Sequence, residues 1–414
     1  MENMNLTRPI VYIDTPPSSI NGDEINGMEG EDVMYLEEME EFEGNLENME
    51  ELSDQEEEDA DMEVPEDQSI VVFNKHQGSV FCCNLHPDGK FAVTGGEDDK
   101  AYVWSTETGQ IITECTGHKD SVIFVGFSFD GAFLASVDMS GVIKVWKCNF
   151  ESTQEWPVAF EYEAGDLIWG LWHFGARVLI CGAASGDIFV FKIPSGDTKI
   201  LPGHNVKTEC GKLFSDGVRL VSGYEDGTVK VWDLKTNSVL HQVPQNVHQI
   251  RVTDVDTHPE NNVMASISTD GKAVLTTSVN GKVVAQLETD NDLEAVAFSN
   301  PQLGYLALGT LNGSVTIWDA GRQMIRHYCS KKEDGVAAGV TKIFWINDQL
   351  VTGCLDGSIR IYDGRSGERS LMLTGHWLEI FDICYNEKQN ILLSTSDDGT
   401  ARIFKYETRS EKVQ

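Results

Sequence analysis

The sequence predicts an all-β fold, an eight-bladed β-propeller preceded by a disordered acidic segment. Three observations lead to this prediction: a repeated hairpin, its nearly constant spacing, and a change of composition near residue 68. The hairpin is clearest at Ser222 to Trp232, SGYEDGTVKVW, where a tight acidic turn precedes residues that alternate between β-branched and polar and end on an aromatic. Because side chains in a strand alternate between faces, this pattern indicates a half-buried strand pair.

The same hairpin returns along the chain, and its last strand ends on an anchor residue that is usually aromatic. Successive anchors are 41 to 45 residues apart, which fits the period of about 40 to 45 residues of a propeller blade. Eight anchors predict eight blades over residues 69–407, closed into a ring that leaves few strand edges exposed. The anchors are Trp104, Trp146, Phe191, Trp232, Thr276, Trp318, Tyr362 and Phe404.

A second repeated feature lies upstream of the hairpin in five of the eight blades. A His precedes a Ser or Thr by eighteen residues, and an acid in the turn completes the set. Such a trio also occurs in hydrolases, but a set that recurs in several blades is more simply a buried hydrogen-bond chain within each blade. The expected structural network comprises His76, Thr94, Asp98, Trp104, His118, Ser136, Trp146, His204, Ser222, Asp226, Trp232, His248, Ser266, Asp270, His376, Ser394, Asp398 and Phe404.

These residues resemble WD40 repeats, through Gly-His pairs at 117–118, 203–204 and 375–376 and through Val-Trp-Asp at 231–233. Longer strings, such as AVTGGEDDKAYVW at 92–104 and DMSGVIKVW at 138–146, resemble the family of the angio-associated migratory cell protein. That family is similar in architecture and charge to a yeast eight-bladed WD-repeat chaperone, which escorts a basic large-subunit ribosomal protein. The resemblance therefore implies either a chaperone in ribosome biogenesis or, by the family's name, a scaffold in cell migration.

The first 68 residues differ from the rest in composition. They contain 24 Asp and Glu residues and one Arg, a formal charge of −23, which leaves −13 of the chain's −36 for the remainder. Such a segment repels itself and can bury little apolar surface, so we expect it to be disordered. It serves either as a solubilising tail or as an acidic arm that binds a basic partner, and both interpretations stay open.

The two ends of the repeat region complement each other. Residues 69–75, SIVVFNK, have the pattern of a strand without a hairpin partner, and the last blade lacks an outer strand. We therefore expect 69–75 to supply the closing outer strand of that blade, with 408–414 as a short C-terminal tail. In the third blade, Trp169 either packs between blades or takes part in binding.

Composition argues against several classes of function. The sequence contains no GxxxxGK[ST], GxSxG or HExxH motif, so we expect no enzyme activity, no catalytic residue and no cofactor. Nine scattered cysteines without a CxxC pair indicate reduced thiols rather than a metal site. No apolar run suits a signal peptide or a membrane span, so we expect a cytoplasmic protein without membrane insertion, with access to the nucleus left open.

Propellers bind partners on the face around their central channel, and side-chain alternation predicts which residues reach it. One position recurs just after the start of each inner strand: Phe81, Ile123, Ile168, Glu209, Thr253, Glu294, Thr341 and Phe381. We expect an acidic face with a few aromatics, which attracts Lys- and Arg-rich segments and disfavours nucleic acid. The predicted protein-binding face comprises Phe81, Glu97, Asp120, Asp138, Asp166, Glu209, Tyr224, Glu225, Glu294, Glu379, Phe381 and Asp397.

These features together favour a monomeric, non-enzymatic binding protein. The preferred hypothesis is a cytosolic chaperone or escort for a basic client such as a nascent large-subunit ribosomal protein. The alternative is a signalling scaffold or adaptor in cell migration and angiogenesis-type pathways. A third class is a substrate-reading subunit of a larger enzyme complex. Strong salt dependence of client binding would favour the first hypothesis, because salt screens charge attraction.

Overall fold

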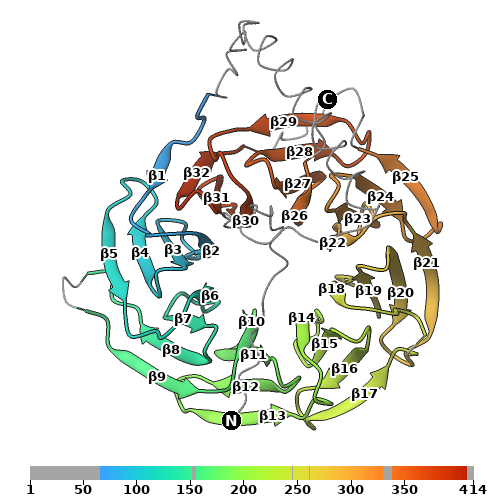
Figure 1. Ribbon diagram of the computed structural model, residues 1–414, viewed down its shortest axis with the longest axis horizontal. Coiled ribbons are helices and arrows are strands. Elements are labelled where there is room, and N and C mark those ends of the chain that lie inside the picture. The colour runs from blue at the N-terminus through green and yellow to red at the C-terminus, as the bar shows by residue number, and fades with distance from the viewer. Residues whose placement is uncertain (1–65, 152–154, 245, 261, 330–337, 408–414) are drawn as a thin grey trace, which may run out of the picture. The chain divides into compact units, whose positions relative to one another are not determined.

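The computed structural model describes residues 66–151, 155–244, 246–260, 262–329 and 338–407, which form a ring of eight four-stranded antiparallel sheets. Figure 1 shows the blades following one another around a central channel, which confirms the predicted eight-bladed propeller. The expected disordered segment, residues 1–68, lies outside the described residues except for its last three, and so does the tail 408–414. Within the described ranges there is no helix that is long and apolar enough to span a membrane.

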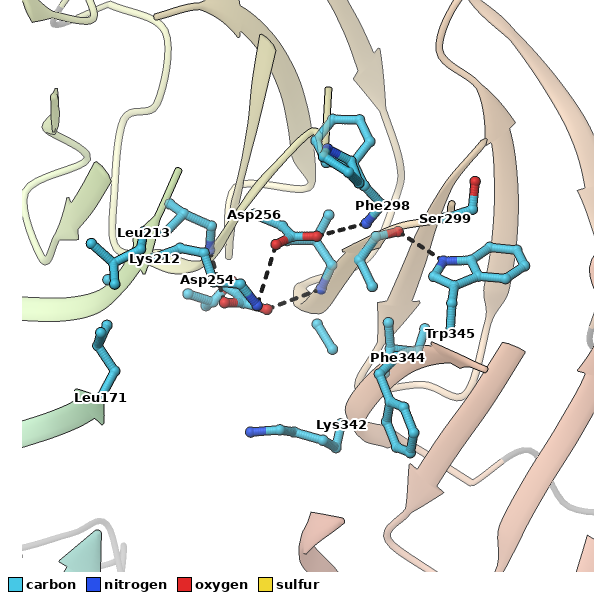
Figure 2. A pocket seen from close by; sticks show the side chains of 18 of the residues that line it. Leu171, Lys212, Leu213, Asp254, Asp256, Phe298, Ser299, Lys342, Phe344 and Trp345 are labelled. Atoms are coloured by element: carbon cyan, nitrogen blue, oxygen red, sulfur yellow. Dashed lines mark hydrogen bonds and ion pairs between the residues drawn. The ribbon is translucent and has the colours of Figure 1, made fainter. Parts of the chain in front are cut away.

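Each blade presents one strand to the channel, and part of the channel wall is shown in Figure 2. The innermost strands are β2 (Val80–Leu85), β6 (Val122–Phe127), β10 (Leu167–Trp172), β14 (Thr208–Leu213), β18 (Val252–Thr257), β22 (Leu293–Phe298), β26 (Val340–Ile346) and β30 (Ile380–Asn386). The second strands are β3 (Phe91–Gly96), β7 (Phe133–Asp138), β11 (Val178–Ala183), β15 (Arg219–Tyr224), β19 (Val263–Ser268), β23 (Tyr305–Thr310), β27 (Gln349–Cys354) and β31 (Ile391–Ser396).

The third and fourth strands complete each sheet toward the outside. The third strands are β4 (Ala101–Ser105), β8 (Val142–Lys147), β12 (Ile188–Lys192), β16 (Val229–Asp233), β20 (Lys272–Thr277), β24 (Val315–Asp319), β28 (Ile359–Asp363) and β32 (Ala401–Lys405). The outer strands are β5 (Ile111–Cys115), β9 (Val158–Glu163), β13 (Asp197–Leu201), β17 (Ser238–Gln242), β21 (Val283–Glu288), β25 (Met324–Tyr328), β29 (Arg369–Leu373) and β1 (Val71–Phe73).

The eighth blade takes its outer strand from the start of the described chain. β1 pairs antiparallel with β32, so that Val71 faces Ile403 and Phe73 faces Ala401. The Phe73 side chain is buried and stacks on the Trp104 ring of the first blade, with ring centroids 4.8 Å apart. Strand pairing and aromatic packing thus join the first and last blades.

Strand register places the same elements of every blade on one face. In the first blade the start of β2 pairs with the end of β3, and the start of β4 pairs with the end of β5. The loops that precede the inner strands and the turns between second and third strands therefore lie at the same edge of each sheet. We call the surface formed by these loops and turns the His-loop face, and the surface formed by the remaining turns the opposite face.

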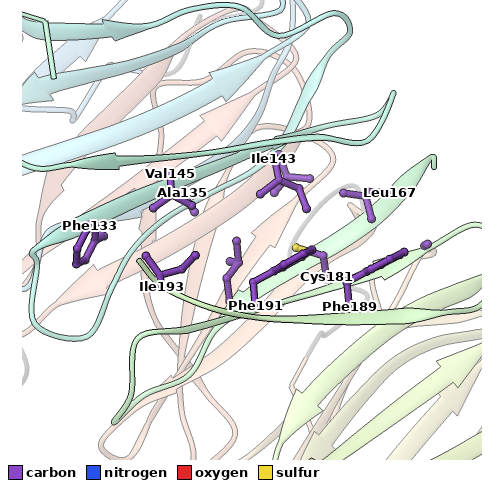
Figure 3. Packing of buried hydrophobic residues seen from close by; sticks show 12 residues of the cluster. Phe133, Ala135, Ile143, Val145, Leu167, Cys181, Phe189, Phe191 and Ile193 are labelled. Carbon is purple, nitrogen blue, oxygen red and sulfur yellow. The ribbon is translucent and has the colours of Figure 1, made fainter. Parts of the chain in front are cut away.

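The core consists of apolar layers between neighbouring blades. Figure 3 shows one such layer, in which Phe133 and Ile143 of the second blade pack with Leu167, Phe189 and Phe191 of the third. Burial of these side chains is the main driving force for stacking blades that could not fold alone.

Trp169 also belongs to an interface between blades. Its indole N–H donates a hydrogen bond to Thr208 Oγ1 of the fourth blade at 3.3 Å, and the ring packs with the cluster between blades three and four. This favours the packing interpretation of Trp169 over a binding role.

The repeated His network is complete in the first blade. His76 Nδ1 lies 2.9 Å from Asp98 Oδ1, His76 Nε2 lies 2.9 Å from Thr94 Oγ1, and the Trp104 indole donates to Thr94 Oγ1 at 3.3 Å. The eighth blade repeats the His contacts, with His376 2.9 Å from Asp398 and 2.8 Å from Ser394, beside the buried anchor Phe404. In the fifth, His248 Nε2 is 2.7 Å from Ser266 Oγ, while His248 Nδ1 and Asp270 Oδ1 are 3.7 Å apart.

In the second blade, Asp138 was expected on the binding face but instead belongs to the buried His network. The Asp138 carboxylate is fully buried, 3.1 Å from His118 Nδ1, and it accepts backbone N–H groups from Lys119 and Val142. Burial alone would raise the pKa of Asp138, but these hydrogen bonds lower it to about 2. Asp138 takes the place of the turn acid because this turn has Ser140 where the other four His-containing blades carry Asp. The rest of the network is as expected: His118 Nε2 contacts Ser136 Oγ, and the anchor Trp146 is buried.

The fourth blade departs from the network in a different way. His204 contacts Asp226 Oδ2 at 3.0 Å and Lys230 Nζ at 2.9 Å instead of Ser222, whose hydroxyl accepts the Trp232 indole N–H at 2.9 Å. The Tyr224 side chain is fully buried, and its ring centroid lies 4.6 Å from that of His204. The structure thus corrects two expectations: His204 is not bonded to Ser222, and Tyr224 is not on the binding face.

Candidate protein-binding face

A β-bulge recurs near the start of every inner strand. In β2 the register shifts between Val80 and Cys82, which leaves Phe81 as the extra residue. A bulge redirects a side chain out of the regular ladder. The eight bulged residues, all partly exposed, are Phe81, Ile123, Ile168, Glu209, Thr253, Glu294, Thr341 and Phe381. They are the eight positions selected by side-chain alternation, and they form a ring where the channel meets the His-loop face.

Two of these bulged residues form an aromatic pair at the junction of the first and last blades. The Phe81 and Phe381 ring centroids are 5.4 Å apart, with the rings tilted by 55°. Both side chains remain partly exposed. Aromatic surface of this kind can anchor an apolar or cationic side chain of a bound segment.

The loop and turn acids of the prediction lie on the His-loop face. The side chains of Glu97, Asp120, Asp166 and Glu225 are exposed, and those of Glu379 and Asp397 are partly exposed. Some of these carboxylates also stabilise their loops: Glu97 Oε2 accepts the backbone N–H of Ser79 at 3.1 Å, and Asp397 accepts the Ser79 hydroxyl. The four exposed carboxylates come from blades one to four, so they give this part of the rim a negative potential.

Two predicted acids are paired with bases that sequence reasoning overlooked. Glu209 Oε1 lies 3.2 Å from Lys207 Nζ, and Glu294 Oε2 lies 3.8 Å from Arg251. Burial raises the pKa of Glu294. These two carboxylates therefore add less to the negative potential than the rim acids do. Lys207 sits two residues from its partner, a proximity visible in the sequence.

Beside the bulged ring, a cavity of about 790 Å³ lies against the inner strands of blades three to seven (Figure 2). Lysines line it as well as acids: Lys212 Nζ is 3.3 Å from Asp256 Oδ1, and Lys342 Nζ is 3.2 Å from Asp382 Oδ1 of the eighth blade. Asp254 accepts the backbone N–H of Val296 at 3.1 Å, and burial raises its pKa to about 6. Carboxylates of the channel wall are therefore partly paired with lysines, whereas no ion pair is found for Glu97, Asp120, Asp166 or Glu225 within the described ranges.

Chemistry on this face is limited by its side chains. In the part of the chain that the structure describes, no three His, Cys, Asp or Glu side chains gather as a metal site requires. The cysteines are free thiols, and burial raises the pKa of Cys181, Cys210 and most of the others. The face presents carboxylates and aromatic rings, a combination suited to binding cationic segments.

Comparison with known proteins places this architecture among repeat propellers. The model of the WD domain, G-beta repeat, matches residues 67–105, 109–147, 196–233 and 367–405. The angio-associated migratory cell protein of Pongo abelii is 37% identical over 363 residues, which are 83% of this chain and 81% of that protein. The ribosome assembly protein SQT1 of Saccharomyces cerevisiae is 23% identical over 405 residues, 88% of this chain and 92% of that protein.

A solved structure shares the fold. Chaetomium thermophilum Sqt1, crystallised with the N-terminus of the ribosomal protein L10, superposes with a TM-score of 0.74 at 22% sequence identity. The match covers 82% of this chain and 100% of the Sqt1 chain. At this level of identity the likeness establishes the common propeller fold.

Proposed function

This chain belongs to the family of the angio-associated migratory cell protein, within the WD40-repeat propellers, and from that premise we propose that it binds a basic client protein and acts without catalysis. The client is a Lys- and Arg-rich segment of a newly made protein, most specifically a large-subunit ribosomal protein, escorted in the cytoplasm. Sqt1, which has the same fold and was crystallised with a ribosomal protein segment, supports this choice of client. The name of the yeast relative, a ribosome assembly protein, supports it further.

One observation carries the proposal: four exposed carboxylates from blades one to four lie on the same face as the bulged ring and its aromatic pair. Glu97, Asp120, Asp166 and Glu225 lie on the same face as Phe81 and Phe381. Exposed carboxylates gathered on one face raise the local concentration of oppositely charged segments and speed their capture. The aromatic pair then offers contacts that hold the captured segment.

The first described residues of the chain lie at the His-loop face. They are attached there because the backbone N–H of Gln68 donates to Thr374 O at 2.9 Å and Asp67 pairs with Arg402. Residues 66–68, which end the acidic segment in the sequence, are therefore fixed at this face. In the proposed mechanism the acidic segment competes with nonspecific polyanions for the client and passes it to the rim.

A pulldown of newly synthesised proteins tests the proposal. The test variant carries Glu97→Lys, Asp120→Lys, Asp166→Lys and Glu225→Lys. The control carries the same charge change on the opposite face, at Glu107, Asp197, Glu260 and Glu387, whose side chains are also exposed.

We expect one basic ribosomal protein to dominate the wild-type and control samples and to disappear from the test variant. If all three chains recover the same partners, and these are not basic, the escort proposal fails. The signalling scaffold suggested by the name of the closely matching relatives would then replace it.

A further inference from the structure

Resting on the proposed function, we propose that Trp377 forms an arginine-selective subsite of the protein-binding face. Its indole stacks on a guanidinium of the client, and the carboxylates of Glu379 and Asp397 accept that group's hydrogen bonds. The proposed client is thus a basic segment with an arginine at the residue that contacts Trp377.

Trp377 is exposed in a way that folding does not require. It follows His376 in the loop that leads to β30, on the His-loop face, and its side chain is 68% exposed. The blade anchors Trp104 and Trp232 are at most 1% exposed. Since burial of apolar surface is what stabilises the fold, an indole left in water contributes little to the stability of the eighth blade.

The position after the network His needs only its backbone. The N–H of Trp377 points to Asp398 Oδ2 at 3.4 Å, and the corresponding N–H of Gln77 donates to Asp98 at 3.1 Å. Any residue can make this contact, and the other four His-containing blades place polar side chains there, all exposed. These side chains are Gln77, Lys119, Asn205 and Gln249. Of the five His-containing blades, only the eighth has an aromatic residue at this position. The His network therefore does not explain why Trp377 is there.

The loop that carries Trp377 is held in place. Asp398, which accepts the Trp377 N–H, is itself fixed by His376 at 2.9 Å. On the other side of the loop the backbone N–H of Asp397 donates to Glu379 O at 3.0 Å. A platform held by such bonds loses little conformational freedom when a ligand binds, which favours affinity.

Two carboxylates come from the loop that carries Trp377 and from the turn bonded to that loop. Glu379 lies two residues beyond Trp377, and Asp397 is joined to Glu379 by the backbone bond described above. Both are partly exposed, and within the described ranges neither forms an ion pair with Lys or Arg. The Phe81 and Phe381 pair begins two residues farther along, at the channel mouth. The loop and the turn bonded to it thus carry a large exposed aromatic surface and two carboxylates that have no Lys or Arg partner within the described ranges.

This combination favours arginine over lysine. A guanidinium is planar, weakly hydrated and able to stack on an indole while its N–H groups bind carboxylates. An ammonium group is a compact, strongly hydrated charge that gains from the carboxylates but less from the ring face. The ratio of the affinities for an arginine and a lysine peptide therefore measures the contribution of Trp377. The affinity that both peptides share measures the contribution of the acidic rim.

The test measures fluorescence anisotropy with the full chain and two labelled peptides, one of alternating Arg and Gly and one of alternating Lys and Gly. We expect the wild-type protein to bind the Arg peptide about tenfold more tightly than the Lys peptide. Trp377→Ala should abolish this preference, and Trp377→Phe should retain part of it. Tyr328→Ala is the matched control, because Tyr328 is also 68% exposed but lies on the outer strand β25.

The outcomes separate the subsite from the proposed function. If both peptides bind with salt-sensitive, equal affinity to wild type and Trp377→Ala, the subsite is overturned and the basic-client proposal stands. If neither peptide binds the wild type, both are overturned. Thermal unfolding of each variant confirms that the comparison is made between folded proteins.

Discussion

The carboxylate of Asp382, on the inner strand of the eighth blade, accepts a hydrogen bond from the backbone N–H of Cys83, on the inner strand of the first, at 3.1 Å. The channel edge of an inner strand has no neighbouring strand, so its N–H groups need other acceptors. The same device joins the fifth and sixth blades, where Asp254 accepts the N–H of Val296. At the closure of the ring, this bond acts together with the pairing of β1 and β32.

Removing the Asp382 carboxylate should destabilise the closed ring. Asp382→Ala leaves the Cys83 N–H without its acceptor and the Lys342 ammonium without its partner, so we expect a loss of about 1–3 kcal/mol in the free energy of unfolding. Asp382→Asn keeps an acceptor oxygen and should lose less. Urea denaturation of the three proteins provides the measurement, and equal midpoints for all of them would refute this role of Asp382.

Truncation should show where the fold begins. A chain that starts at residue 66 retains β1 and the Phe73 ring stacked on Trp104, and we expect it to melt cooperatively near the wild-type temperature. A chain that starts at residue 75 leaves the β32 edge unpaired and should aggregate or melt several degrees lower. Calorimetry distinguishes the two, and identical melting of both truncations would show that β1 is dispensable.

The buried His residues predict how stability depends on pH. Burial lowers the pKa of His376 below its ordinary value of 6.5 despite the neighbouring Asp398, so the folded state resists protonation. The unfolded chain takes up a proton at about pH 6.5, and the stability contributed by neutral His376 is therefore complete above that pH and lost as the pH falls below it. Asp398, whose pKa is lowered to about 2 by His376 and Thr400 against the effect of burial, adds a second loss between about pH 4 and 2.

His376→Gln isolates the first of these effects. The free energy of unfolding of the wild type should decrease between pH 7.5 and 5, and the variant should show a shallower decrease over that range. His248 keeps some of the slope in both proteins, since burial lowers its pKa as well. Denaturant titrations at several pH values provide the data, and parallel profiles would contradict the assignment to His376.

The two acids that the sequence grouped together should behave differently. Asp138→Ala removes the acceptor of His118 and of two backbone N–H groups, so we expect a loss of about 2–3 kcal/mol in stability with client affinity retained in the folded fraction. Asp120→Ala, at an exposed site, should change stability by less than about 0.5 kcal/mol and weaken client binding. Denaturation and binding assays on both variants check the distinction, which fails if Asp138→Ala is as stable as wild type.

Much of the fold could be predicted from the sequence because a propeller repeats its local environment. Residues at the same offset in each repeat meet the same neighbours, so the spacing of Trp104, Trp146 and the other anchors gave the blade count. Side-chain alternation likewise located the positions at which the inner strands bulge, such as Phe81 and Phe381. The pairing of β1 with β32 could be predicted because the last blade lacks an outer strand in sequence order, and the strand at the start of the repeat region has no hairpin partner.

The remaining features depend on contacts that change from blade to blade. Asp138 is the acid of the network in the second blade because Ser140 occupies the turn position where the acid is missing. Tyr224 is buried with its ring next to that of His204, a contact that is specific to the fourth blade. Arg251 and Glu294 belong to different blades, so their pairing depends on how the blades stack. Trp377 could have been noticed as the aromatic among polar residues that follow the repeated His, but its exposure comes from the structure.

The salt dependence of client binding tests the central claim most directly. The purified full chain is titrated with the labelled Arg peptide, and then with a purified basic ribosomal protein, over a range of NaCl concentrations. If the acidic rim captures the client, affinity should fall steeply with increasing salt in the wild type and the opposite-face control, and the Glu97, Asp120, Asp166, Glu225 reversal should bind weakly at every concentration. Tight binding that is independent of salt and unchanged by the reversal would contradict the account and favour an apolar scaffold contact.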